Sequence, residues 1–175
     1  MSRAKKLAGL GVVLLFYVTI PLLYLFTAAS LDDALRLPPL LPAQVNLFLA
    51  AICLLVGLFW SSWAYSYLHF VGEGSPAEIF GYAIYPTQNL VTTGPYAYSR
   101  NSMVFGMFFI LLGIALYANS VAGIALLPIG WLIAMAYIRR FEEPGLVERF
   151  GDEYVEYRKR VPMLLPSLRP YARTS

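Results

Sequence analysis

The chain has 175 residues, of which 59% are hydrophobic and only 13% are charged, with 13 Lys and Arg against 10 Asp and Glu. Soluble domains carry about 25% charged residues, so this composition excludes a soluble globular protein and indicates a single helical membrane domain over residues 1–175. Cys53 and His69 are the only residues of their types, which excludes an intrachain disulfide and Cys- or His-based metal sites. We therefore expect no bound metal.

Four apolar segments predict four transmembrane helices. In chain order they cover residues 7–29, 45–71, 103–117 and 121–138. A membrane helix needs about 20 apolar residues, and the last two segments are close to the lower limit of that length. The first segment follows basic residues, as the apolar region of a signal peptide would. Its apolar run is longer than such a region, so we expect a membrane anchor.

The last two segments are joined by only three residues, 118–120, which predicts a tight antiparallel hairpin. Gly106 and Gly113 lie seven residues apart on one helix, and Gly123 and Gly130 lie seven apart on the other. Seven residues return to nearly the same helix face, so each pair can line a close contact between helices.

The distribution of basic residues predicts the orientation. If the N-terminus is cytoplasmic, four spans place residues 30–44 and the tip of the hairpin on the outer side. Of the 13 lysines and arginines, Arg36 alone then lies outside. Cytoplasmic segments of membrane proteins carry an excess of Lys and Arg, so we expect both termini in the cytoplasm. The segments 72–102 and 139–166 lie on the same side.

The first polar cluster precedes the third span. Gly94-Pro95 is a turn signal, and Tyr96 follows it. Arg100 stands at the N-terminal edge of a helix, where free N–H groups and the helix dipole also attract anions. This segment is suited to a carboxylate or phosphate. Alternatively, Arg100 extends to lipid phosphates at the membrane surface.

The second polar cluster follows the fourth span and contains Arg139, Glu142 and Glu143. If the helix continues, Arg139 shares a face with both glutamates, at spacings of three and four residues. Charges this close to the hydrocarbon are costly unless they are paired or functional. A simple interfacial salt bridge is the alternative, and Pro144 either kinks the helix or starts a new one.

Residues 148–160 form a charged, amphipathic helix. Phe150, Tyr154, Tyr157 and Val161 recur at spacings of four, three and four, which gives this segment one apolar face. We expect the helix to lie along the membrane or to cap the bundle.

In this order around a tight hairpin, the two clusters resemble the isoprenylcysteine carboxyl methyltransferase and phospholipid methyltransferase-like membrane enzymes. The family pattern is Leu-Val-x-x-Gly-x-Tyr-x-x-x-Arg-His/Asn-Pro-x-Tyr, followed after the hairpin by Glu-Glu, Phe-Gly-x-x-Tyr-x-x-Tyr and Val-Pro. The resemblance covers about residues 70–166. The matching residues are Leu90, Val91, Gly94, Tyr96, Arg100, Asn101, Glu142, Glu143, Phe150, Gly151, Tyr154, Tyr157, Val161 and Pro162.

The resemblance implies an all-α, polytopic membrane protein that uses S-adenosylmethionine at its cytoplasmic face. It assigns Arg139 to the substrate and places Glu143 beside Glu142, which binds the cofactor. An amine or thiol acceptor has to lose a proton, and we expect Glu143 to be the base in that case. The residues implied to bind the cofactor are Gln88, Asn89, Leu90, Val91, Tyr96, Arg100, Asn101, Ser102, Met103, Val104 and Glu142. The chain departs from the pattern at Ser102, where the family has proline, and at Val104, where it has tyrosine.

The resemblance favours carboxyl O-methylation of an isoprenylcysteine-like molecule that enters from the bilayer. Membrane lipids are the other expected partners, and no nucleic acid is expected. Methylation of a phospholipid amine or a small thiol is an alternative. A sterol-type reductase that uses NADPH is another, because it shares Tyr98-Ser99-Arg100 with a following Gly106. A non-enzymatic scaffold is the third. Asn101 is typical of prokaryotic relatives, so we expect a prokaryotic cytoplasmic membrane.

Overall fold

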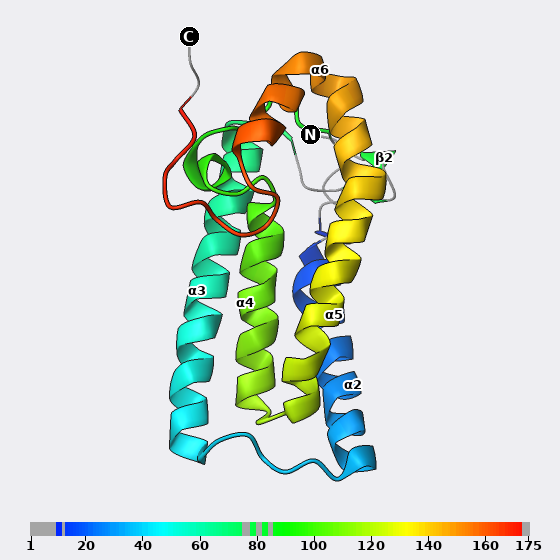
Figure 1. Ribbon diagram of the computed structural model, residues 1–175, viewed down its shortest axis with the longest axis vertical. Coiled ribbons are helices and arrows are strands. Elements are labelled where there is room, and N and C mark those ends of the chain that lie inside the picture. Colours follow the sequence, from blue (N-terminus) through cyan, green and yellow to red (C-terminus); the bar gives the residue numbers. More distant parts are fainter. Residues whose placement is uncertain (1–9, 12, 75–77, 80–81, 84–85, 173–175) are drawn as a thin grey trace.

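The computed structural model describes residues 10–11, 13–74, 78–79, 82–83 and 86–172. The elements follow in the order η1 (Leu15–Thr19), α2 (Ile20–Leu35), α3 (Ala43–Phe70), β1 (Glu78–Ile79), β2 (Tyr82–Ala83), η2 (Gly94–Ala97), α4 (Ser102–Tyr117), α5 (Val121–Tyr137), η3 (Ile138–Glu142) and α6 (Glu143–Arg160). The long helices run side by side, and α6 arches over one end of the bundle (Figure 1). The predicted all-α class is confirmed, with one minimal antiparallel hairpin of β1 and β2 added.

Three helices in the described part of the chain are long and apolar enough to cross a membrane. They are Leu15–Leu35, Ala43–Phe70 and Val121–Arg160, the last of which includes the turn into α6. Helix α4 is apolar but has only 16 residues. Large apolar side chains such as Phe48, Phe59 and Leu132 are exposed on these helices. Such surfaces are stable only in lipid, so the chain is a multi-pass membrane protein.

Helices α3 and α4 approach closely because glycines line their contact. A Cβ added at Gly57 of α3 would lie 2.7 Å from the backbone nitrogen of Ile110. Added at Gly106 and Gly113 of α4, it would meet Ser61 and Leu54. The predicted close contact along Gly106 and Gly113 is therefore confirmed, and its partner is α3.

The loop end of the bundle, opposite α6 in Figure 1, is held by side chains that cap backbone groups. Asn119, in the left-handed conformation (φ 54°), accepts hydrogen bonds from the Leu40 and Leu41 N–H groups and donates to the Leu41 carbonyl. Asp32 Oδ1 accepts from the Ala122 N–H at 2.9 Å at the start of α5. This contact explains why α2 extends to Leu35, beyond the predicted end of the first span at residue 29.

Two π-helical turns each stand directly before a proline. In η3 the Glu143 N–H donates to the Ile138 carbonyl, five residues back, and Pro144 follows. In η1 the same pattern precedes Pro21. Proline has no N–H, and its ring crowds the carbonyl four residues before it. The wider turn relieves that crowding, and such turns often occur at functional sites.

Helix α6 caps the bundle, which was one of the two arrangements expected for it. Its predicted apolar face is confirmed, because Tyr154, Tyr157 and Val161 form a buried cluster against Leu90. Gly151 has φ 56° and ψ −135°, so the helix is broken at this point. A left-handed φ favours glycine, and the break lets the helix turn back over the bundle (Figure 1).

The segment after α6 wraps around the turn that carries Arg100. Its backbone carbonyls at Pro162 and Met163 accept hydrogen bonds from the N–H groups of Arg100 and Asn101. Further along, the Tyr171 N–H donates to the Ala97 carbonyl at 2.8 Å. We call residues 162–171 the C-terminal strap. It fixes the backbone from which the first cluster of polar side chains projects.

Candidate functional site

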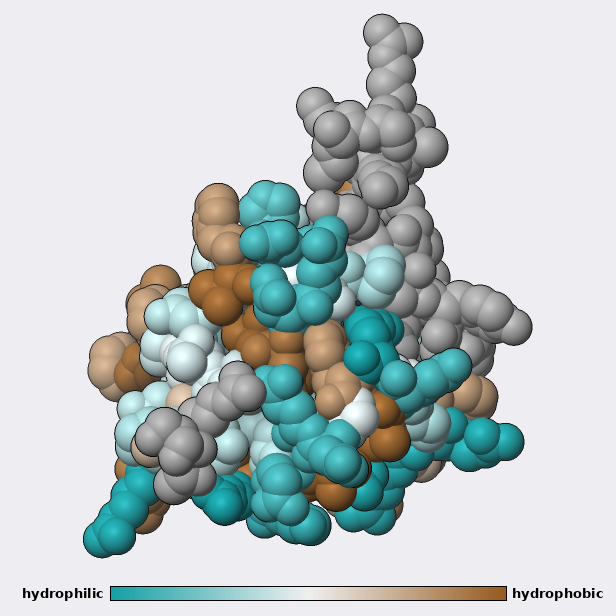
Figure 2. All heavy atoms as spheres, turned by 90° about the horizontal axis from the view of Figure 1, so that it is seen from above, coloured by the Kyte–Doolittle hydropathy of each residue, from teal (hydrophilic) through white to brown (hydrophobic). Residues whose placement is uncertain are grey.

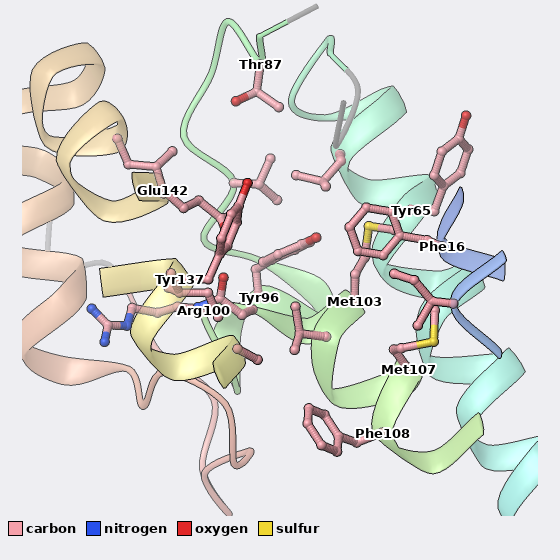
Figure 3. A pocket seen from close by; sticks show the side chains of 18 of the residues that line it. Phe16, Tyr65, Thr87, Tyr96, Arg100, Met103, Met107, Phe108, Tyr137 and Glu142 are labelled. Carbon is pink, nitrogen blue, oxygen red and sulfur yellow. The ribbon is translucent and has the colours of Figure 1, made fainter. Parts of the chain in front are cut away.

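A cavity of about 510 Å³ lies inside the bundle beneath α6 and has one polar and one apolar end. Figure 3 shows Thr87 and Glu142 toward one end, Phe108 at the other, and the Tyr96 ring pointing into the space between them. The lining residues are Val13, Phe16, Tyr17, Ile20, Tyr65, Leu68, Thr87, Leu90, Val91, Tyr96, Arg100, Asn101, Met103, Val104, Met107, Phe108, Leu111, Gly130, Ile133, Ala134, Tyr137, Ile138, Glu142, Leu146, Arg149, Phe150, Tyr154 and Tyr157.

The polar end combines groups of both charges. Glu142 projects from the π-turn η3, and Arg149 from the first half of α6. The Arg149 guanidinium donates a long hydrogen bond of 3.5 Å to Thr87 Oγ1. That contact joins α6 to the segment that leads into η2. The polar end therefore offers a carboxylate and a guanidinium to one ligand.

A buried ion pair supports the wall of the cavity. Arg100 Nη1 lies 2.9 Å from Glu143 Oε1, and both side chains are only 8% exposed. Arg158 Nη1 lies 3.6 Å from Glu143 Oε2, and the Tyr154 hydroxyl donates to Oε1 at 3.4 Å. The carboxylate of Glu143 is thus enclosed by two arginines and a tyrosine, which compensates the cost of burying its charge.

Tyr96 is held in the cavity by its backbone. The Tyr157 hydroxyl donates to the Tyr96 carbonyl at 2.6 Å, which ties η2 to α6. Burial, and then the neighbouring Glu142 carboxylate, raises the pKa of the Tyr96 phenol well above its usual value. The phenol therefore stays neutral at physiological pH and presents a neutral hydroxyl and an aromatic face to the cavity.

The apolar end extends into the membrane-spanning part of the bundle. It is lined by Phe16 of η1, by Met107, Phe108 and Leu111 of α4, and by Ile133 of α5. Figure 3 places Phe108 farthest from Thr87 among the labelled side chains. This end has no charged lining residue among those the structure describes. It suits an aliphatic group.

The structure brings most of the predicted cofactor residues to this cavity. The residues that line it are Leu90, Val91, Tyr96, Arg100, Asn101, Met103, Val104 and Glu142. Gln88 and Asn89 are exposed beside it. Ser102 is buried, and its hydroxyl donates to the Pro95 and Ser99 carbonyls, so it closes the turn before α4 instead of facing the cavity.

The two predicted catalytic residues lie elsewhere. Arg139 is exposed and is not among the lining residues. Arg139 and Glu142 both lie in the π-turn, which has more residues per turn than an α-helix, so they do not share the face expected from α-helical spacing. Glu143 also does not line the cavity. It forms an ion pair with Arg100, which does line it.

Several lining residues were not predicted. Thr87, Tyr137 and the residues of η1 gave no local signal, because only the packing of distant segments places them here. Arg149 did carry a signal, since it follows Glu142 by seven residues. That spacing places two side chains near the same helix face.

The surface of the bundle at its α6 end is polar. Figure 2 views the end covered by α6 and shows mostly hydrophilic residues there, with apolar side chains between them. The exposed basic residues of this end include Arg158, Lys159 and Arg169. Such a surface fits the aqueous boundary of a membrane that begins at the apolar helices below it.

Comparison with known proteins agrees with this architecture. The family model described as phospholipid methyltransferase matches residues 45–153, more than half of the chain. The human protein-S-isoprenylcysteine O-methyltransferase is 34% identical over 84 residues, which cover 47% of this chain and 29% of the human protein.

The fission yeast protein of the same name, from Schizosaccharomyces pombe, is 40% identical over 78 residues, 44% of this chain and 33% of that protein. The chain thus matches about a third of the length of these relatives. No solved structure gives a significant match. The ordered motifs, the helical membrane bundle and the family match over residues 45–153 establish that the chain belongs to the phospholipid methyltransferase family.

Proposed function

We propose that the chain is an S-adenosylmethionine-dependent methyltransferase that acts on a lipophilic acceptor at the cytoplasmic face of the membrane. The observation that carries the proposal is one cavity that joins a charged end to an apolar end inside a membrane bundle. The favoured reaction is carboxyl O-methylation of an isoprenylcysteine-like molecule. The names of the human and fission yeast relatives support that choice.

The side chains at the polar end fit S-adenosylmethionine. This cofactor supplies a methyl group that its sulfonium has already activated, and it also carries an ammonium, a carboxylate and ribose hydroxyls. Glu142 suits the ammonium or the hydroxyls, and Arg149 suits the carboxylate. The aromatic faces of Tyr96 and Tyr137 attract positive charge. The ammonium and the carboxylate of the cofactor thus each find an opposite charge among the lining residues.

The arrangement around Glu143 favours an acceptor that needs no base. Its oxygens face Arg100 and Arg158, and it does not line the cavity. It is therefore poorly placed to remove a proton from an acceptor. A carboxylate acceptor is already ionised, and the protein then has only to align it and exclude water. An amine acceptor would have to use Glu142, the carboxylate that does line the cavity.

We further propose that both termini and the polar end of the cavity face the cytoplasm. Among the lysines and arginines that the structure describes, Arg36, at the end of α2, alone falls on the side of the bundle opposite α6. Accessibility of single introduced cysteines on either side of sealed vesicles tests this orientation.

Calorimetry of the detergent-purified protein with S-adenosylmethionine tests the proposed cofactor. We expect binding by the wild type and its loss in Glu142→Gln, with Glu148→Gln as the matched control. Glu148 lies exposed on α6 outside the cavity lining. Folded wild-type protein that does not bind S-adenosylmethionine would contradict the proposal, and binding of NADPH in its place would indicate a reductase.

A further inference from the structure

We infer that Gly130 of α5 and Phe108 of α4 set the length of the apolar chain that the acceptor can carry. The inference rests on the proposed function, because it takes the apolar end of the cavity as the place where the acceptor's chain binds. Beyond the proposed function, the inference names the residues that limit the length of this chain. Both residues line the apolar end.

Helices α4 and α5 separate from one another along their length. At the loop end, a Cβ added at Gly123 would lie 2.9 Å from the Cβ of Ala115, so the helices touch. Seven residues on, about 10 Å along α5, a Cβ added at Gly130 would meet only the Phe108 ring, at 3.9 Å. The space opened by this divergence is the apolar end of the cavity, and the absence of a side chain at Gly130 keeps it open.

The Phe108 ring bounds this space, and its orientation is fixed by a neighbouring aromatic side chain. Phe108 packs edge-on against Trp131, with ring centroids 4.7 Å apart and an interplanar angle of 67°. Such an aromatic pair favours a defined orientation. In Figure 3 Phe108 lies at the end of the cavity away from Thr87 and Glu142. A chain that enters from the polar end therefore meets Phe108 near the far end of the lining.

The dimensions favour a single chain. Along α4 the lining extends from Asn101 to Leu111, ten residues or about 15 Å. Cavities of a few hundred Å³ enclose one ligand of drug size, and this one has about 510 Å³. A cofactor bound at the polar end would take up much of this volume, so room remains for one apolar chain. The cavity thus selects one apolar chain of limited length, and any second chain stays in the bilayer.

Binding of N-acetylcysteine derivatives with S-geranyl, S-farnesyl and S-geranylgeranyl groups to the protein in nanodiscs tests the inference. Affinities are measured by displacement of a fluorescent S-farnesylcysteine, which needs no methyl transfer. In Gly130→Leu we expect the longest chain to lose affinity by about tenfold or more relative to the shortest, because misfit of even one methylene in an apolar pocket costs that much. Phe108→Ala should shift the preference toward the longest chain. Ile129→Leu, at an exposed position outside the lining, is the matched control.

Unchanged chain-length profiles in folded Gly130→Leu and Phe108→Ala would overturn the inference. If Gly130→Leu does not fold, Phe108→Ala decides alone. Binding of S-adenosylmethionine, measured in the same variants, separates the two proposals, since neither residue is at the polar end. A shifted profile in a protein that binds no S-adenosylmethionine would uphold the chain-length limit and reject the proposed cofactor.

Discussion

Replacement of Arg100 by methionine tests the buried ion pair that supports the cavity. The substitution keeps an unbranched side chain of similar reach but leaves Glu143, which is only 8% exposed, without its partner at 2.9 Å. Loss of one member of a buried pair costs about 3–5 kcal/mol. Arg158 remains 3.6 Å from the other oxygen, so we expect the lower end of that range. Arg158→Met removes a side chain that is 42% exposed and should cost at most about 1 kcal/mol.

The free energy of unfolding can be measured in mixed micelles at increasing SDS, with tryptophan fluorescence as the signal. The double variant Arg100→Met/Glu143→Leu removes both charges and should recover much of the loss, since a buried apolar pair is often as stable as an ion pair. The reasoning would be refuted if Arg100→Met cost no more than Arg158→Met. It would also fail if the double variant were less stable than Arg100→Met.

Three further predictions follow from the packing and the strap. Gly57→Ala forces a methyl group against the α4 backbone, so it should lower the free energy of unfolding by about 1–3 kcal/mol, whereas Gly11→Ala, in open space, should not. The raised pKa of Tyr96 means that above about pH 10 the unfolded chain loses this proton while the folded chain keeps it. Stability should therefore fall as the pH rises past 10 in the wild type, and less so in Tyr96→Phe, as thermal melts between pH 8 and 11 will test. Truncation after Val161 removes the C-terminal strap, and calorimetry should then show S-adenosylmethionine affinity lowered by about tenfold or more; unchanged affinity would show that the strap does not position the site.

The helices were predictable because hydrophobicity over long runs does not depend on tertiary contacts. The hairpin at residues 118–120 followed from its length alone, and the close approach at Gly106 and Gly113 followed from their spacing. The predicted end of the first span, at residue 29, was wrong because α2 is extended by a contact with a segment distant in sequence. Residues 30–44 were expected to connect the first two spans, yet the Asp32 side chain caps the start of α5 and α2 continues past it to Leu35.

In the candidate site too, residues that belong to local motifs were predictable, and residues placed by contacts between distant segments were not. Tyr96, Asn101 and Glu142 were identifiable from motifs, and they line the cavity. Thr87 was not, because only the contact with α6 brings it to the polar end. The surroundings of Arg139 could not be deduced from α-helical spacing, since a π-turn before a proline is a response to local crowding that periodicity does not reveal.

Transfer of labelled methyl groups from S-adenosylmethionine to N-acetyl-S-farnesylcysteine in liposomes tests the central claim most directly. We predict a labelled product that releases its label on alkaline hydrolysis, as a methyl ester does. Glu148→Gln should form this product, and Glu142→Gln should not. A label that resists alkali would contradict carboxyl O-methylation and indicate transfer to nitrogen or sulfur. No transfer by folded wild-type protein to this acceptor or to aminophospholipids would contradict the methyltransferase account.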